Sequence, residues 1–359
     1  MIMINKIITR IVLIIFNVFF APILLFSLKS KNIIVFGERL GLTYQDNSRF
    51  LFEYANKQKA LKAIWITRDK KIFSFLKKKK YNVCYRDSFK ALYYIVLAKY
   101  IFITVDFKDV SQLIKIRPRL KIVQLWHGTP LKKNVIDTGN EKYYLHTVAS
   151  SLYLKSQITA KNKKIKKILT GYPRNDALDG IKKSKKFTIA YFPTYTSQFD
   201  FITLPNIDES RKIKLLKDKK NLDLFISLHP SIKNYKNIDN ILFDKLDSSP
   251  TFNTYKFLNN VDLLITDISS IFFDYLLLQR PIIFLIKNKN FQQKIPLRFD
   301  LAKTVPGFIA SNWTEVILEI ENILNNKDNY ILKRKKISSE FNHYNDNCSS
   351  ERIFKELKI

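Results

Sequence analysis

Cysteine, glycine and histidine are scarce in this chain of 359 residues, which has two cysteines, seven glycines and four histidines. Cys84 and Cys348 are too few for a metal site and lie far apart in the sequence, so reduced thiols in a cytosolic protein are the simplest interpretation. The sequence has no extended low-complexity tract and no internal repeat at solenoid or propeller spacing. With 46% hydrophobic and 14% aromatic residues, it has enough apolar side chains for two domain cores, and intrinsic disorder is excluded.

Acidic residues are also in short supply, since 31 Asp and Glu face 62 Lys and Arg and leave a formal charge of +31. Such an excess attracts an anionic partner: nucleic acid, a lipid surface, or a phosphate-rich substrate or polymer. Part of it is equally explained by base-composition bias, and the basic runs at 77–80 and 333–336 are typical of solvated faces. No RRM-like, zinc-finger or helix-turn-helix signature is present, so we expect no nucleic-acid partner.

Charge is absent altogether from residues 11–26, "IVLIIFNVFFAPILLF", which follow Lys6 and Arg10. As a helix these residues would span roughly 24 Å, less than the roughly 30 Å of a bilayer core, and Pro22 would interrupt them. No small-residue cleavage site follows, which disfavours a signal peptide. We predict that residues 1–29 form a membrane-associating helix; a plain core helix is the alternative.

From residue 32 onward, short apolar runs alternate with longer segments of helical spacing. Buried strands are predicted at 32–36, 62–67, 82–85, 100–105 and 121–126, with helices at 47–58 and 88–99 among them. After a lysine-dense interruption and a linker near 175–186, a second series has strands at 187–192, 222–228, 262–266 and 281–285. This alternation predicts an α/β protein with two Rossmann-type domains and a cleft between them, a GT-B-like arrangement. The predicted domains are 30–178 and 179–359, the latter ending in amphipathic helices from about 313 that pack back across the domains.

Several common catalytic signatures are missing: GxGxxG, the P-loop, DxD, HExxH and GxSxG. Their absence disfavours dinucleotide redox chemistry, P-loop phosphoryl transfer and serine hydrolysis. The polar motifs that the sequence does contain lie where strands are predicted to end. Ligands of open parallel sheets bind beyond the carboxyl ends of the strands.

One such place is "DLLITDISSIFFDYLLLQRPIIFL", residues 262–285, in which a strand leads to Asp267, Ser269 and Ser270 and then to an apolar helix with Asp274. Hydroxyls and free N–H groups at a helix start bind phosphate well. The alternative is a plain N-cap without a ligand. Asp274, one turn further on, is within reach of a hydroxyl-bearing ligand.

Histidine occurs at two more strand ends, as His127 in "QLWHGTPLKK" and His229 in "SLHP". Gly128 and Pro130 turn the chain after the strand, and a histidine of near-neutral pKa at a cleft can take a proton from an attacking hydroxyl. Lys132 and Lys133 would attract anions. For either histidine a satisfied structural role is the alternative.

"GYPRND" places Arg174, Asn175 and Asp176 directly before the predicted linker. The arginine suits bidentate contact with phosphate, and a salt bridge at the start of a helix is an equal alternative.

The sequence resembles the CDP-glycerol glycerophosphotransferase family in five signatures and in their order along the chain. They are "LWHGTPLKK", "GYPRND", "FPTYT", "SLHP" and "TDISSIFFD". The similarity covers roughly residues 30–310 and includes "FGERLGLTYQDNSRFLFEYANK". It implies a GT-B fold at the inner face of the membrane and a donor such as CDP-glycerol or CDP-ribitol. An acceptor hydroxyl would attack the phosphorus next to the polyol, and CMP would leave.

The resemblance also assigns roles to individual residues. His127 matches the family's proposed general base, and His229 matches a second essential histidine at the donor phosphates. Asp274 matches a carboxylate near the donor polyol, and Arg174 is a donor phosphate contact. The remaining residues expected to bind the donor are Gly128, Thr129, Thr266, Asp267, Ser269 and Ser270. Two departures from the family pattern, Ile268 in place of tyrosine and no basic residue directly before "HP", bear on donor preference.

The expected partners are thus a CDP-polyol donor, a lipid-linked glycan or teichoic acid acceptor, and the membrane surface. We expect no cofactor and no metal held by the protein; association of Mg²⁺ with the donor, the acceptor's identity and oligomerisation stay open. The expected location is the cytoplasmic face of the cell membrane. The alternatives are a GT-B glycosyltransferase that uses a nucleotide sugar for surface polysaccharide, and a non-enzymatic binder of anionic polymers.

Overall fold

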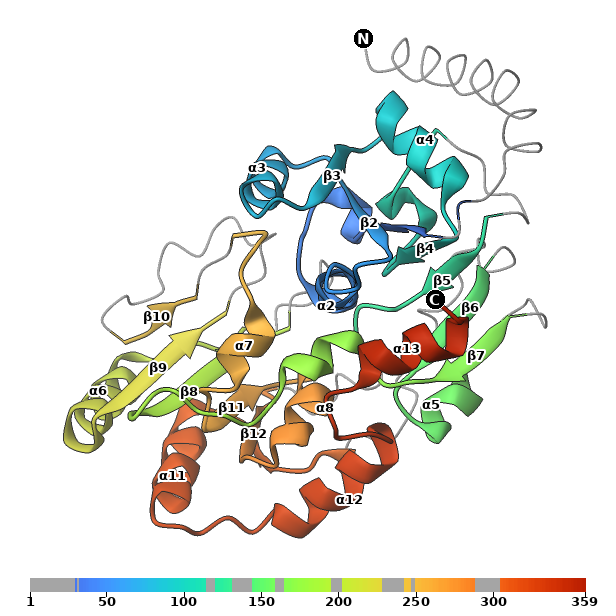
Figure 1. The fold of residues 1–359 in the computed structure, drawn as a ribbon. Coiled ribbons are helices and arrows are strands. Elements are labelled where there is room, and N and C mark those ends of the chain that lie inside the picture. Colours follow the sequence, from blue (N-terminus) through green and yellow to red (C-terminus); the bar gives the residue numbers. More distant parts are fainter. Residues whose placement is uncertain are drawn as a thin grey trace, which may run out of the picture.

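The computed structural model describes residue 30 and residues 32–113, 120–130, 144–158, 165–194, 202–227, 242–246, 249–287 and 304–359. These residues form two parallel sheets, each covered by helices on both faces (Figure 1). This is the α/β architecture with two Rossmann-type sheets that the strand and helix alternation predicts. The predicted N-terminal helix, residues 1–29, lies outside the described residues.

The first sheet has seven strands in the order β3-β2-β1-β4-β5-β6-β7. Its described helices are α2 (Asp46–Ala55), α3 (Lys70–Lys78), α4 (Phe89–Leu97) and α5 (Leu152–Gln157). The strands are β1 (Ile33–Phe36), β2 (Lys62–Thr67), β3 (Asn82–Tyr85), β4 (Tyr100–Ile103), β5 (Ile122–Gln124), β6 (Tyr144–Ala149) and β7 (Lys166–Leu169).

The second sheet has six strands in the order β10-β9-β8-β11-β12-β13. They are β8 (Phe187–Phe192), β9 (Leu222–Ile226), β10 (Asp244–Lys245), β11 (Leu263–Thr266), β12 (Ile282–Leu285) and β13 (Phe308–Ala310). Helices α6 (Ile207–Lys220), α7 (Thr254–Leu258), α8 (Ile271–Tyr275), α11 (Trp313–Leu324) and α12 (Ile331–Phe341) belong to this half of the chain.

Alternating side chains of each central strand enter different cores. In β1, Ile34 and Phe36 pack with α2 and α3, whereas Ile33 and Val35 pack with α4 on the opposite face. Strands buried on both faces have continuous apolar sequences, which is why β1, β2, β8, β11 and β12 were predictable from the sequence. The strand β6 and the edge strands β7, β10 and β13 were not predicted.

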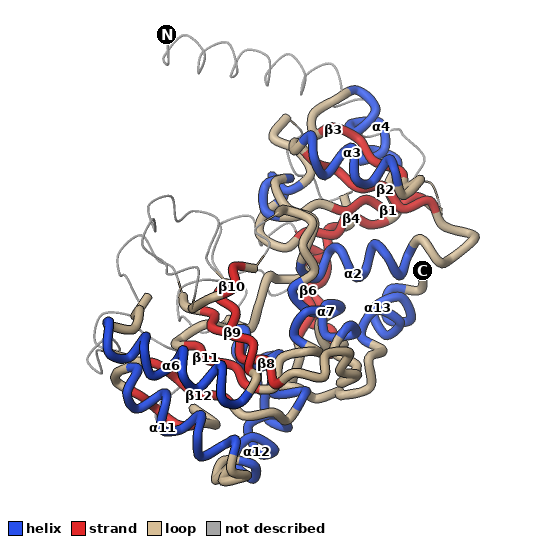
Figure 2. The backbone as a smooth tube through the Cα atoms, turned by 90° about the vertical axis from the view of Figure 1, so that its left-hand side faces the viewer, coloured by secondary structure: helices blue, strands red, loops and turns tan. Residues whose placement is uncertain are grey.

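The last helix, α13 (Ser349–Leu357), returns to the first sheet. Its residues Ile353, Phe354 and Leu357 join the core formed by α2 and β1, and Figure 2 shows α13 beside α2. A hydrogen bond of 3.0 Å from the Tyr100 hydroxyl to the Leu357 carbonyl fixes its end. The carboxyl-terminal helices therefore pack on both halves, as the amphipathic pattern predicts.

Candidate functional site

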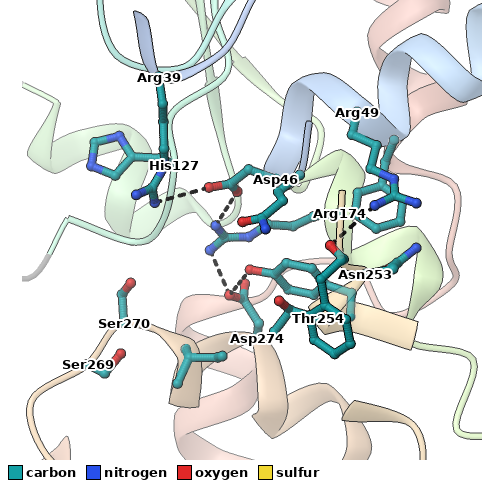
Figure 3. A pocket seen from close by; sticks show the side chains of 15 residues that line it. Arg39, Asp46, Arg49, His127, Arg174, Asn253, Thr254, Ser269, Ser270 and Asp274 are labelled. Atoms are coloured by element: carbon teal, nitrogen blue, oxygen red, sulfur yellow. Dashed lines mark hydrogen bonds and ion pairs between the residues drawn. The ribbon is translucent and has the colours of Figure 1, made fainter. Parts of the chain in front are cut away.

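A cavity of about 180 Å³ lies between the carboxyl edges of the two sheets (Figure 3). The half of the chain with the first sheet contributes Arg39, Asp46, His127 and Arg174 to its lining, and the other half contributes Ser269, Ser270, Asp274 and the segment 252–255. Five residues singled out in the sequence, which are separated by up to 147 positions, thus meet in one place: His127, Arg174, Ser269, Ser270 and Asp274.

The His127 ring is oriented by a backbone carbonyl. Its Nδ1 lies 3.2 Å from the carbonyl oxygen of Thr104, which follows β4. Because a carbonyl only accepts hydrogen bonds, Nδ1 carries the proton, and Nε2 of the neutral ring keeps its lone pair. Burial and the neighbouring Arg39 lower the pKa of His127 below its ordinary value of 6.5. At neutral pH the ring is therefore uncharged, and its Nε2 can accept a proton.

The turn that presents His127 is held by the buried side chain of Asn47. The Asn47 amide nitrogen donates to the carbonyl oxygens of Leu125 and Trp126, at 2.9 Å each. Trp126 has a φ of +60°, which ends the extended strand, and its indole N–H donates to the Thr147 hydroxyl at 2.8 Å. Left-handed backbone is costly for a bulky residue, so these contacts compensate for the conformation that brings His127 to the cavity.

Gly128 approaches the second half of the chain closely. A Cβ atom at this position would lie 2.6 Å from the hydroxyl oxygen of Ser270, closer than atoms tolerate. The sequence "HGT" therefore allows the His127 turn to lie against the Ser269–Ser270 segment. Thr129, the next residue, is buried rather than open to the cavity.

Arg174 lies between two carboxylates that come from different halves of the chain. Its Nη1 is 2.6 Å from Asp46 Oδ1, and its Nη2 is 2.6 Å from Asp274 Oδ2 (Figure 3). Its backbone N–H also donates to the Asn47 side-chain oxygen at 3.2 Å. Arg174 thus makes two salt bridges, of the kind that the sequence analysis gave as the alternative to phosphate binding. They join α2, the 3-10 helix η4 (Pro173–Ala177) and α8.

The two carboxylates beside Arg174 differ in pKa. Burial raises the pKa of Asp274 to about 6, although Arg174 acts in the opposite direction. Burial also acts to raise the pKa of Asp46, but the charges of Arg174 and Arg39 outweigh it and lower that pKa. Asp274 Oδ1 is buried and has no hydrogen-bond partner among the described residues, which leaves an acceptor beside the cavity.

Thr266 and Asp267, at the end of β11, are bonded to the neighbouring strand β8 and the loop after it. The Thr266 hydroxyl donates to the Phe192 carbonyl at 2.7 Å. Asp267 accepts hydrogen bonds from the backbone N–H and the hydroxyl of Thr194, and burial raises its pKa to about 6. In this structure both residues thus tie the end of β11 to the end of β8 and to Thr194.

The helix after this segment is shorter than the apolar sequence suggests. α8 ends at Tyr275 and continues as the 3-10 helix η5 (Leu276–Leu278). Ser270 stands at the N-cap position, as the alternative interpretation of the sequence had it, but its side chain makes no capping hydrogen bond. Because α8 has five residues, its dipole contributes little, and the hydroxyls of Ser269 and Ser270 are the polar groups that line the cavity.

Asp176 of "GYPRND" has a structural role. Its two carboxylate oxygens accept hydrogen bonds from the backbone N–H groups of Ser349 and Ser350, at 2.7 and 2.8 Å, and so cap the start of α13. Burial raises its pKa. Asn175 is buried in η4.

Sequence reasoning did not assign several charged or amide side chains at the site, among them Arg39, Asp46, Asn47 and Arg49. These four lie in the segment after β1, where a carboxyl strand end followed by several polar residues could have indicated them. Arg39 is 42% exposed and lies 3.6 Å from Asp46 Oδ2. Arg49 donates to the Thr251 carbonyl at 2.8 Å and so ties α2 to the other half of the chain.

The cavity therefore combines a proton acceptor with anion-binding groups. Nε2 of His127 can take a proton from a hydroxyl, and the partly exposed Arg39 can bind a phosphate together with the two serine hydroxyls. His229, Lys132 and Lys133 lie outside the described residues. None of the helices in the described ranges is both long and apolar enough to cross a bilayer.

Curated relatives of this chain are teichoic acid enzymes. It is 26% identical to a teichoic acid glycerol-phosphate transferase of Staphylococcus aureus, over 92% of this chain and 94% of that protein. It is 28% identical to a teichoic acid poly(glycerol phosphate) polymerase of Bacillus spizizenii, over 92% of each chain.

Solved structures agree on the fold. A variant of the wall teichoic acid polymerase TagF superimposes with a TM-score of 0.73 at 19% identity, over 92% of this chain and 89% of that chain. A UDP-GlcNAc 2-epimerase from Neisseria meningitidis shares the fold more distantly, with a TM-score of 0.56 at 11% identity, over 91% of this chain and 100% of that chain. Residues 19–358 match the family described as CDP-glycerol:poly(glycerophosphate) glycerophosphotransferase. The chain belongs to this family of teichoic acid polyol-phosphate transferases.

Proposed function

We propose that this enzyme transfers a glycerol-phosphate unit, or a related polyol-phosphate unit, from its CDP donor to a hydroxyl of a lipid-linked cell-envelope glycan or teichoic acid. A bond forms between the acceptor oxygen and the phosphorus next to the polyol, and the bond from that phosphorus to the CMP oxygen breaks. The acceptor's proton passes to Nε2 of His127, and CMP leaves with the electron pair of the broken bond.

One observation carries this proposal. The unprotonated Nε2 of His127, fixed by the bond from Nδ1 to the Thr104 carbonyl, shares a cavity with Arg39 and with the hydroxyls of Ser269 and Ser270. Proton transfer by a positioned group contributes about 10²–10⁴-fold to a rate. The arginine and the hydroxyls would bind the donor phosphates, and His229 is assigned to the same donor by the family resemblance.

The other donor contacts follow from the same geometry. The unpartnered Oδ1 of Asp274 would accept a hydrogen bond from a polyol hydroxyl. Arg174 would hold Asp274 and Asp46 in place and add positive charge near the pyrophosphate. Gly128 would lie beside the donor with the buried Thr129 behind it, and Thr266 and Asp267 would support the serine segment.

We further propose that residues 30–178 bind the acceptor and that residues 179–359 bind the donor. The reaction would take place at the cytoplasmic face of the membrane. The assay is CMP release by the purified chain from CDP-glycerol and, separately, from CDP-ribitol, with and without a membrane-lipid acceptor fraction. We expect acceptor-dependent release from one of the two donors. Transfer from a nucleotide sugar, with no CMP release from either CDP-polyol, would replace this proposal with a glycosyltransferase.

A further inference from the structure

A buried carboxyl group that is not part of the cavity lining lies between two loops that position cavity residues. Asp109 ends the 3-10 helix η2 (Phe107–Asp109), which follows β4, and it is inaccessible to solvent. The cavity lining includes His127 and Arg39 but not Asp109. The two carboxyl oxygens of Asp109 accept hydrogen bonds from different loops, and each loop leads to one of these cavity residues.

The first loop orients the ring of His127. Asp109 Oδ2 accepts hydrogen bonds from the backbone N–H groups of Thr104 and Val105, at 2.9 Å each. The Val105 N–H and the Thr104 carbonyl belong to the same peptide group, and that carbonyl oxygen lies 3.2 Å from Nδ1 of His127. Asp109 therefore holds one end of the peptide group whose other end keeps the proton of His127 on Nδ1 and the lone pair on Nε2.

The second loop carries Arg39. Asp109 Oδ1 accepts a hydrogen bond of 2.8 Å from the backbone N–H of Leu40. Arg39 and Leu40 have φ values of +39° and +61°, a left-handed backbone that non-glycine residues adopt only where surrounding contacts hold it. The Arg39 N–H donates to the Thr104 hydroxyl at 3.4 Å, so it too is bonded to the first loop. These bonds maintain the conformation that brings Arg39 to the cavity.

The two loops can share one carboxyl group because they leave neighbouring strands. β1 and β4 pair in parallel, so their carboxyl ends lie side by side. Gly37, which follows β1, lets η2 approach this edge: a Cβ atom there would lie 2.6 Å from the Asp109 carbonyl oxygen and from Val110 Cγ1. The position of Asp109 between the loops is thus fixed by the backbone itself.

We propose that Asp109 is a positioning residue of the transfer reaction, which holds His127 and Arg39 in fixed relation to each other. Both residues lie at the same end of the cavity (Figure 3). A misplacement of about 1 Å can lower a rate roughly 100-fold. The inference rests on the proposed function for the roles of His127 and Arg39, but the proton position on the His127 ring is measured without donor or acceptor.

The first experiment follows that ring by nitrogen NMR in the full chain with isotope-labelled histidine, and His127→Ala identifies its signals. We expect the Nδ1–H form alone in the unsubstituted chain and a mixture of both neutral forms in Asp109→Ala, which removes both acceptors. Asp262→Asn is the control, because Asp262 also accepts a backbone N–H, that of Thr188 at 2.7 Å, but precedes β11 at the opposite edge of its sheet. An unchanged His127 ring in Asp109→Ala would overturn the inference.

The second experiment measures kcat and the donor KM for acceptor-dependent CMP release. We expect Asp109→Ala to lower kcat about tenfold or more and to raise the donor KM, because Arg39 is displaced as well. In a His127→Ala background the same substitution should lower kcat by less than about twofold, since the base is already absent. Equal losses of kcat in both backgrounds would show a general disruption of the fold and would overturn the inference.

Two further measurements keep the test valid if Asp109→Ala does not fold. Asp109→Asn keeps one acceptor oxygen, so it should change either the His127 ring or the donor KM, and a native result for both would contradict the inference. In the unsubstituted chain the Leu40 amide should exchange its hydrogen slowly although Leu40 is 37% exposed, and fast exchange would also contradict it. If the unsubstituted chain released no CMP, the proposed function would fail, whereas the ring and exchange measurements would still decide the role of Asp109.

Discussion

Nη2 of Arg174 and Oδ2 of Asp274 lie 2.6 Å apart, and this ion pair joins the half of the chain with the first sheet to the half with the second. Both side chains are almost inaccessible to solvent, at 3% and 0%. Asp46 binds the other side of the guanidinium, so one arginine connects α2, η4 and α8. The cavity between the sheets therefore depends on a buried charge network whose members come from distant parts of the sequence.

Removing one charge from this network should be costly. We expect Asp274→Asn to reduce the free energy of unfolding by about 3 kcal/mol or more, because Arg174 keeps only Asp46 as a charged partner. Urea unfolding measures the change. Asp208→Asn is the control, since Asp208 pairs with Arg211 on the surface, where such pairs contribute about 0–1 kcal/mol. Equal losses of unfolding free energy in the two variants would show that the buried ion pair contributes no more to stability than the surface pair.

Gly128 and Ser270 should be energetically coupled. A Gly128→Ala methyl group would lie 2.6 Å from the Ser270 hydroxyl oxygen but 3.4 Å from its Cβ. We expect Gly128→Ala to destabilise the chain by about 1–3 kcal/mol, and by clearly less in a Ser270→Ala background. A double-mutant cycle of unfolding free energies tests this. The same loss in both backgrounds would mean that the two residues do not touch.

Asn47 should control the position of His127 rather than the chemistry itself. Asn47→Asp replaces the amide that donates to Leu125 and Trp126 with two acceptors, which repel those carbonyls. We expect kcat for CMP release to fall by about tenfold or more, with a shifted pH profile because His127 is displaced. Asn56→Asp, which loses one hydrogen bond to the Phe52 carbonyl on the same helix, is the control. An unchanged pH profile would reduce Asn47 to a stabilising role.

Glu38 should make the chain less stable as pH rises. Burial and then the charge of Asp46 raise the pKa of Glu38 from 4.5 to about 8, and its carboxyl group closes the loop that carries Arg39 by bonding to Thr43 and to the Gln45 N–H. Between pH 4.5 and 8 the native chain holds a proton that the unfolded chain has lost, so the free energy of unfolding declines with increasing pH.

The glutamine of Glu38→Gln does not titrate. The free energy of unfolding of this variant, relative to that of the unsubstituted chain, should therefore rise between pH 4.5 and 8 and then level off. Urea unfolding at several pH values measures the difference, with the exposed Glu340→Gln as control. A difference independent of pH would contradict the raised pKa of Glu38.

Sequence patterns predicted the central strands because these are buried on both faces and have continuous apolar runs. β6 was missed because its sequence, YLHTVA, interrupts the apolar run with His146 and Thr147. β7 begins with Lys166 and Lys167, which fit an edge strand that faces solvent but which resembled a linker in the sequence.

The candidate site was predictable where polar residues follow strands, as for His127, Ser269, Ser270 and Asp274. Pairings across the cavity were not predictable. No local pattern reveals that Asp46 and Asp274, which are 228 positions apart, bind the same arginine, or that Asn47 fixes the turn at Trp126. Such contacts depend on how the two halves of the chain pack.

The most direct test of the central claim is the pH dependence of acceptor-dependent CMP release from the CDP-polyol donor, measured for the native chain, for His127→Ala and for the exposed His343→Ala. Because burial and Arg39 lower the pKa of His127, we predict that the native rate falls only on the acid side, with an inflection below pH 6.5. His127→Ala should lose about 100-fold or more of the rate, together with that inflection, whereas His343→Ala should behave like the native chain. A His127→Ala variant that keeps the native rate and the native pH profile would contradict the assignment of His127 as the base.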